Sequence, residues 1–117
     1  MKYSDKQRNN MSNKKQFGVW MDSHQAIVVG RENVDSGDFK ILAHVDGGAD
    51  HSKLFKQITS HLQNAEEVHI TGTGDYQEQF IHHLSATPLF KNTVAKESTS
   101  NKLSDEKLVE YISAKFN

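Results

Sequence analysis

The first stretch that could do chemistry is HVDGGADHSK, residues 44–53, which holds the glycine pair Gly47 and Gly48. Glycines reach backbone angles that a Cβ disfavours, and the free amides at the start of a helix are suited to a phosphate or carboxylate. The same loop carries Asp46 and Asp50, whose charges would repel an anion. An ordinary Gly-Gly turn with an aspartate helix cap is therefore the alternative interpretation.

A second candidate is Asp22, which follows a predicted strand where ribonuclease-H-like nucleases place a metal-binding carboxylate. Two-metal chemistry needs further carboxylates around ions about 4 Å apart, and Glu66, Glu67 and Asp75 are the available partners. Glu66 and Glu67 precede their predicted strand and have no evident reason to converge on Asp22, which also suits the first position of a turn. We expect a turn here and no metal-dependent nuclease.

Metal, cofactor and covalent chemistry find little support elsewhere in the chain. The seven histidines form no HEXXH pattern, cysteine is absent, and no GXSXG sequence marks a serine nucleophile. The loop GTGDYQ, residues 72–77, follows a predicted strand, but Gln77 stands where a dinucleotide fingerprint needs its third glycine. We expect no metal, no cofactor and no enzyme activity.

Hydrophobic periodicity predicts the elements that must position these residues. Runs rich in Val, Ile and aromatic residues indicate strands, and apolar residues three and four apart indicate helices. The expected strands are 17–22, 25–30, 39–45, 68–70 and 92–97, and the expected helices are 51–63, 75–85 and 105–116. The order βββαβαβα predicts an α/β fold, a mixed sheet with helices packed on it, of the ribonuclease-H-like or translational-machinery-component type.

Length and charge suggest one folded unit with a basic arm. A chain of 117 residues has room for one core, which we place at residues 17–117. We expect residues 1–16 to form a flexible leader, which carries five cationic side chains and one acidic one, a net charge of +4. Residues 17–117 therefore carry a net charge of −5, which gives the total of −1. With no cysteine and no apolar run near the ~20 residues of a membrane helix, we expect a cytoplasmic protein that has no membrane partner.

The order of elements and the glycine loop together carry a family resemblance. The three-strand opening, the Gly-Gly loop, the helix containing Leu54 and Phe55, and TGTGD at 71–75 resemble the middle domain of archaeal and eukaryotic class-one peptide release factors and of Pelota. The chain is also similar to small bacterial release-factor-like proteins, and the resemblance spans about residues 17–116. In release factors this loop bears Gly-Gly-Gln, whose glutamine supports hydrolysis of peptidyl-tRNA. Here Ala49 stands in place of that glutamine.

The resemblance implies a non-catalytic protein that associates with the ribosome or RNA, because Pelota and bacterial release-factor-like hibernation factors lack a working glutamine and still bind ribosomes. The candidate contacts are His44, Gly47, Gly48, Ala49, Lys53 and Lys56. Two alternatives stay open. One is the ribonuclease-H-like nuclease, and the other is a protein-interaction module unrelated to nucleic acid, which the acidic body favours because nucleic-acid binders generally show a basic face.

Overall fold

The chain folds around a five-stranded mixed sheet, seen in the computed structural model, which describes residues 15–31, 38–74 and 76–116. The elements in chain order are β1 (Gln16–Met21), β2 (Gln25–Gly30), β3 (Lys40–Asp46), α2 (His51–Thr59), β4 (Glu67–Gly72), α3 (Tyr76–Ser85), the 3₁₀ turn η2 (Pro88–Phe90), β5 (Val94–Glu97) and α4 (Asp105–Phe116). The predicted order and the predicted α/β class are confirmed.

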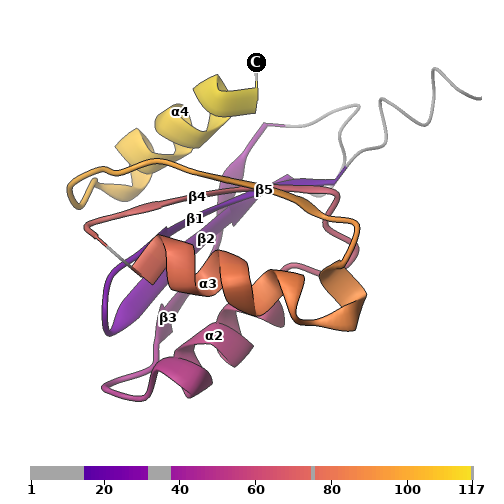
Figure 1. The fold of residues 1–117 in the computed structure, drawn as a ribbon. Coiled ribbons are helices and arrows are strands. Elements are labelled where there is room, and N and C mark those ends of the chain that lie inside the picture. The colour runs from indigo at the N-terminus through magenta and orange to yellow at the C-terminus, as the bar shows by residue number, and fades with distance from the viewer. Residues whose placement is uncertain (1–14, 32–37, 75, 117) are drawn as a thin grey trace, which may run out of the picture.

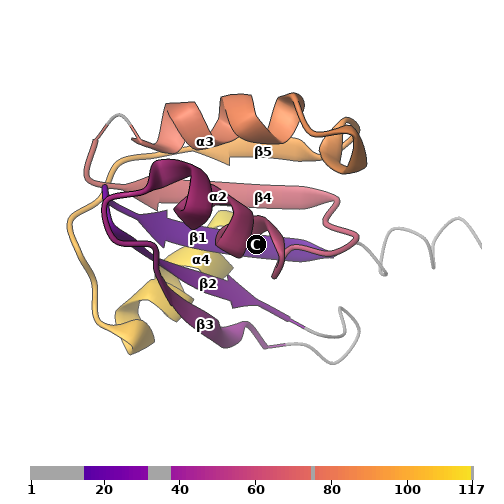
Figure 2. The ribbon, with the colours of Figure 1, turned by 90° about the horizontal axis from the view of Figure 1, so that it is seen from below.

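The strands lie in the order β3-β2-β1-β4-β5, with β1 in the centre (Figure 2). The first three strands pair antiparallel, and β4 runs parallel to both β1 and β5. Val19 in the middle of β1 faces Val28 on one side and Ile70 on the other. The short turn after β1 allows antiparallel pairing, whereas β4 and β5 follow helices and can therefore return in parallel.

The helices form a layer on each face of the sheet. Figure 1 shows α2 and α3 below the sheet and α4 above it. The larger apolar cluster lies between the sheet and the helices α2 and α3, where the rings of Phe55 and Phe80 are 5.3 Å apart. The smaller cluster lies under α4, where Trp20 packs with Leu108 and Ile112. No helix within the described ranges is long and apolar enough to cross a membrane.

The helix predicted at 51–63 is shorter than expected. It ends at Thr59, because Thr59 Oγ1 donates to the carbonyl of Lys56 and Ser60 Oγ donates to that of Gln57, which favours a turn. The chain then reverses through Asn64, whose φ of 63° is left-handed. Leu62 is nevertheless fully buried, so the apolar spacing identified a core residue beyond the end of the helix.

The sheet begins at Gln16, one residue before the expected domain start. The carbonyl of Lys15 accepts hydrogen bonds from the amides of Glu66 and Glu67, and Gln16 pairs with Glu67 in the first rung between β1 and β4. These bonds tie the end of the predicted leader to the sheet. The rest of that leader, residues 1–14, lies outside the described residues.

Candidate functional site

The glycine loop connects β3 to α2 by a close approach that only glycine permits. A Cβ on Gly47 would lie 2.6 Å from the Cβ and 2.8 Å from the Cα of Leu54, a fully buried residue of α2. Gly48 has open space around its Cα but a φ of +61°, which residues with a side chain rarely adopt. The two glycines therefore serve different local needs, one steric and one conformational.

The backbone amides of this loop already have acceptors within the protein. Gly47 N–H donates to the carbonyl of His24 at 2.9 Å, and Gly48 N–H donates to a carboxylate oxygen of Asp46 at 3.0 Å. Asp50 caps α2 by accepting from Lys53 N–H at 3.1 Å. An anion bound by these amides would have to displace two carboxylates, so anion binding by the loop backbone is unfavourable.

The structure separates the predicted site residues into two groups. Gly48, Ala49 and Lys53 are exposed at the start of α2 and Lys56 is exposed in its last turn, whereas Gly47 is buried. His44 is exposed on the α4 side of the sheet, where its Nε2 lies 3.0 Å from a carboxylate oxygen of Asp105. Because α2 and α4 cover opposite faces (Figure 1), His44 does not join the lysines in one surface.

The carboxylates considered for a nuclease do not converge. Asp22 accepts from the amides of His24 and Gln25 at 2.8 and 2.9 Å, which is a turn geometry. Burial works to raise the pKa of Asp22, but these hydrogen bonds outweigh it and hold the pKa below its usual range. Glu67 pairs with the first residue of β1 while Asp22 follows its last, about 20 Å away at the usual rise per residue.

Neighbouring groups do not complete a metal site at Asp22 either. Asp75 lies outside the described residues, and within the described ranges no three His, Asp or Glu side chains are grouped to hold a metal ion. Nothing in this geometry favours the nuclease alternative.

The second glycine loop is anchored by a buried amide. The side chain of Gln77 is fully buried, accepts from Gly74 N–H at 3.2 Å and donates to the carbonyl of Ser98 at 3.0 Å. A Cβ on Gly72 would lie only 2.0 Å from the carbonyl oxygen of Met21. Gln77 therefore has a structural task here, which is to fix the β4–α3 turn against the chain that follows β5.

That chain brings together a polar cluster that the sequence did not single out. After β5 it continues beside β4, because Ser98 and Ser100 donate their amides to Ile70 and Gly72. The cluster, which we call the hydroxyl cluster, consists of His69, Thr71, Ser98, Ser100 and Tyr111. It lies between β4, the residues after β5 and α4.

Ser98 Oγ lies at the centre of the hydrogen bonds of the hydroxyl cluster. Ser98 Oγ donates to Thr71 Oγ1 at 3.0 Å, and Thr71 Oγ1 donates to Ser100 Oγ at 2.9 Å. Ser98 Oγ also lies 2.8 Å from both Tyr111 OH and His69 Nε2.

Two lysines surround this cluster and perturb its titration. Burial is the main cause of a lowered pKa at His69, and the ammonium groups of Lys115 and Lys96 add to it. Burial works to raise the pKa of Tyr111, but hydrogen bonds with Ser98 and Thr71, together with Lys115, leave it lower than usual. Lys115 Nζ lies 5.0 Å from the centre of the Tyr111 ring. His69 is therefore neutral at neutral pH.

Part of this cluster had a signal in the sequence. Residues 67–71 alternate polar and apolar, which places Glu67, His69 and Thr71 on one face of β4. Tyr111 and Lys115 are four apart and share a helix face. Nothing local shows that Ser98 reaches them, since it lies in the polar stretch 97–102, which has no hydrophobic periodicity.

Comparison with known proteins shows which solved structures have a similar fold. No family model matches the sequence, and no curated protein sequence matches it significantly. Among solved structures, Pelota from Archaeoglobus fulgidus matches with a TM-score of 0.58 and 15% identity, over 99% of this chain and 41% of Pelota. A structure described as an archaeal protein matches with a TM-score of 0.59 and 12% identity, over 89% of this chain and 35% of that one.

The archaeal translation termination factor aRF1 also matches, with a TM-score of 0.46 and 12% identity, over 81% of this chain and 33% of that factor. The chain thus spans about two fifths of the length of Pelota. The expected resemblance is confirmed at the level of fold, which is that of a Pelota-like domain.

Proposed function

We propose that this protein acts in translation as a cytoplasmic docking protein, which binds the ribosome or its RNA without hydrolysing peptidyl-tRNA. The observation that carries the proposal is a Pelota-like fold along nearly the whole chain, with an exposed glycine loop at the start of α2. Translation is the setting that the release-factor and Pelota resemblance implies.

The surface offered for docking is the start of α2. Gly48 and Ala49 form an exposed tip, and two exposed ammonium groups follow it along α2, from Lys53 in the first turn and Lys56 in the last. The loop amides are engaged by Asp46 and Asp50, so cationic side chains and not the backbone would contact phosphate. Each such contact releases counterions and makes binding sensitive to salt.

The absence of hydrolysis follows from the tip itself. Ala49 supplies only a methyl group at the position where the resembling loop of release factors carries glutamine. A methyl group can neither orient water nor hydrogen-bond to a developing oxyanion. Robust ribosome-dependent peptide release by the purified protein would contradict this part of the proposal.

Co-sedimentation with purified ribosomes over a salt series tests the docking role. We expect the protein to pellet with ribosomes at low salt, with affinity falling as salt rises. Replacing Lys53 and Lys56 together by glutamine should weaken binding and reduce the magnitude of the salt slope by about 1.5, since each phosphate contact contributes about 0.7–0.9.

A matched control uses two exposed lysines away from this surface, Lys91 after η2 and Lys107 on α4. Their double glutamine variant changes the net charge equally and should bind as the unmodified protein does. Equal weakening in both double variants would show that only net charge matters, and failure to pellet at any salt would overturn the proposal.

A further inference from the structure

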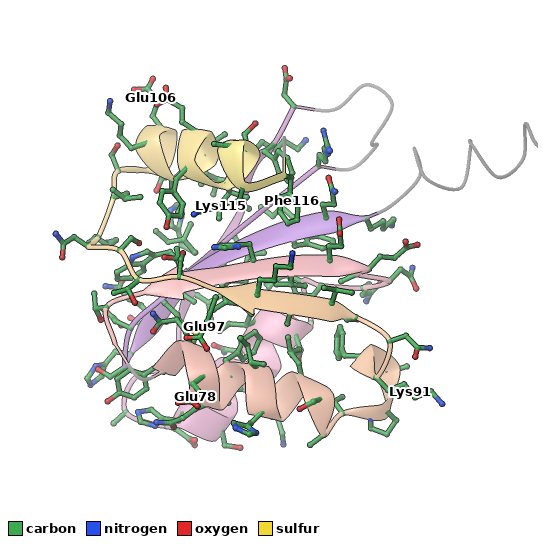
Figure 3. The ribbon with its side chains drawn as sticks, turned by 45° about the horizontal axis from the view of Figure 1, so that its top comes forward. Glu78, Lys91, Glu97, Glu106, Lys115 and Phe116 are labelled. Atoms are coloured by element: carbon green, nitrogen blue, oxygen red, sulfur yellow. The ribbon has the colours of Figure 1, made fainter. Side chains whose placement is uncertain are left out.

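A groove runs beside the hydroxyl cluster, on the face of the sheet opposite α2 and α3. It lies between β4, β5 and the end of α4, and encloses about 150 Å³. Its polar lining consists of Gln16, Glu67, His69, Lys96 and Lys115, and its apolar walls include Val94 and Phe116. Figure 3 shows Lys115 and Phe116 at the end of α4 that closes this groove.

The groove exists because α4 covers only part of the sheet. The helix packs on β1, β2 and β3, so β4 and β5 keep an open strip on this face. Strand alternation points His69 and its neighbour Lys96 into this strip, while Ala95 packs in the core on the other face. Glu97, on the α3 side in Figure 3, is excluded from the groove for the same reason.

We propose that this groove is a binding site for a tetrahedral oxyanion of the size of phosphate or sulfate. Two ammonium groups, from Lys96 on β5 and Lys115 on α4, line the groove together with His69. The groove, of about 150 Å³, has room for a five-atom oxyanion.

Glu67 is the one carboxylate in the lining, and its charge opposes an anion. Its Oε1 accepts a hydrogen bond from Gln16 Nε2 at 2.7 Å, and Gln16 Oε1 in turn accepts from Arg31. This chain of donors holds the carboxylate toward β1 and offsets part of its charge, which leaves the lysines to determine the sign of the ligand.

His69 couples the site to pH. The charged or titratable groups around it are Glu67 on β4, Lys96 on β5, and Tyr111 and Lys115 on α4. Its Nε2 lies 2.8 Å from Ser98 Oγ, and charging the imidazole requires one further proton. Two ammonium groups disfavour that proton, and a bound anion would favour it. Binding should therefore strengthen as pH falls and should raise the pKa of His69.

Nuclear magnetic resonance titration with sulfate tests the inference, because sulfate keeps its charge over the pH range in which histidine titrates. At constant ionic strength, set with chloride, we expect saturable shifts confined to β4, β5 and the last turn of α4. The pKa of His69 should rise when sulfate is present. Lys96→Gln and Lys115→Gln should each weaken sulfate binding about 1.5- to fivefold, the range of an exposed ion pair.

Two further variants test the location of the site and the sign of the ligand's charge. Lys91→Gln, which Figure 3 places near η2 and far from Lys115, should leave sulfate binding unchanged. Glu67→Gln should strengthen sulfate binding. Weaker binding in Glu67→Gln, or shifts that do not saturate or that Lys91→Gln reduces equally, would overturn the proposal.

The source of the oxyanion is decided by competition. If a short single-stranded RNA displaces sulfate from His69, a backbone phosphate occupies the groove, and if inorganic phosphate alone does so, the ligand is a free oxyanion. The proposal does not depend on the docking role, because this groove and the start of α2 lie on opposite faces of the sheet (Figure 1). Displacement by neither would overturn it.

Discussion

Replacing Gly47 by alanine separates a structural need for the glycine loop from a functional one. The added methyl would lie 2.6 and 2.8 Å from two atoms of Leu54, one of them backbone, so rotation of a side chain cannot relieve the clash. Relief requires α2 to shift outward by several tenths of an ångström, although Leu54 and Ile58 are fully buried. Overpacking of this kind costs about 3 kcal/mol at the upper end of its usual range.

Part of that cost is offset in the unfolded chain. Alanine has less conformational freedom than glycine, which stabilises the fold by about 0.4–1 kcal/mol. The net expected loss is about 2–2.5 kcal/mol. For a domain of about 100 residues this lowers the melting temperature by about 8–20 °C.

Urea denaturation followed by circular dichroism measures this loss, with two glycines as references. Gly74→Ala meets no atom within 4 Å and has no positive φ, so its effect should stay within about 0.5 kcal/mol. Gly48→Ala has open space but a φ of +61°, and should cost about 1 kcal/mol. A Gly47→Ala variant as stable as Gly74→Ala would refute the steric reasoning and leave ribosome contact as the explanation for this glycine.

Three further predictions concern the residues that hold the hydroxyl cluster. Gly72→Ala should destabilise the protein more than Gly47→Ala in the same urea assay, because its methyl would lie 2.0 Å from a backbone oxygen in the central pair of strands. Gln77→Leu should cost about 1–3 kcal/mol in urea, because it leaves the Ser98 carbonyl without its donor, and a neutral result would contradict the role given to the buried amide. Stability should fall as pH drops below 6.5, the ordinary pKa of histidine, and through the lower pKa of folded His69, because the unfolded chain then binds more protons. Urea midpoints across this range should show the loss, and His69→Gln should reduce it.

The fold was predictable because its signals are local. Strands β1 and β2 are short runs of branched and aromatic residues around a polar turn, and the apolar face of α2 repeats at Leu54, Phe55 and Ile58. The sequence also indicated the cap at Asp50. The predicted end of this helix, residue 63, was wrong. Leu62 continues the apolar spacing, but hydrogen bonds from Thr59 and Ser60 stop the helix earlier.

The candidate site was only partly predictable. The loop at Gly47 and Gly48 was visible as a loop, but a sequence does not show that its amides are satisfied or that His44 points to the other face of the sheet. The hydrogen bonds of the loop amides depend on how α2 packs after the loop. The position of His44 depends on the alternation of side chains along β3 and on contact with Asp105, 61 residues later.

The sequence by itself determined the order of elements, the glycine loop and the lack of a glutamine at Ala49, because propensity, spacing and residue identity are properties of neighbours along the chain. Only the tertiary structure decided that His69, Ser98 and Tyr111 meet, and that Lys96 and Lys115 face one groove. These residues come from β4, the edge strand β5, the chain after β5 and the last helix. Their meeting depends on parallel pairing of β4 with β5 and on how far α4 reaches across the sheet, which no local pattern encodes.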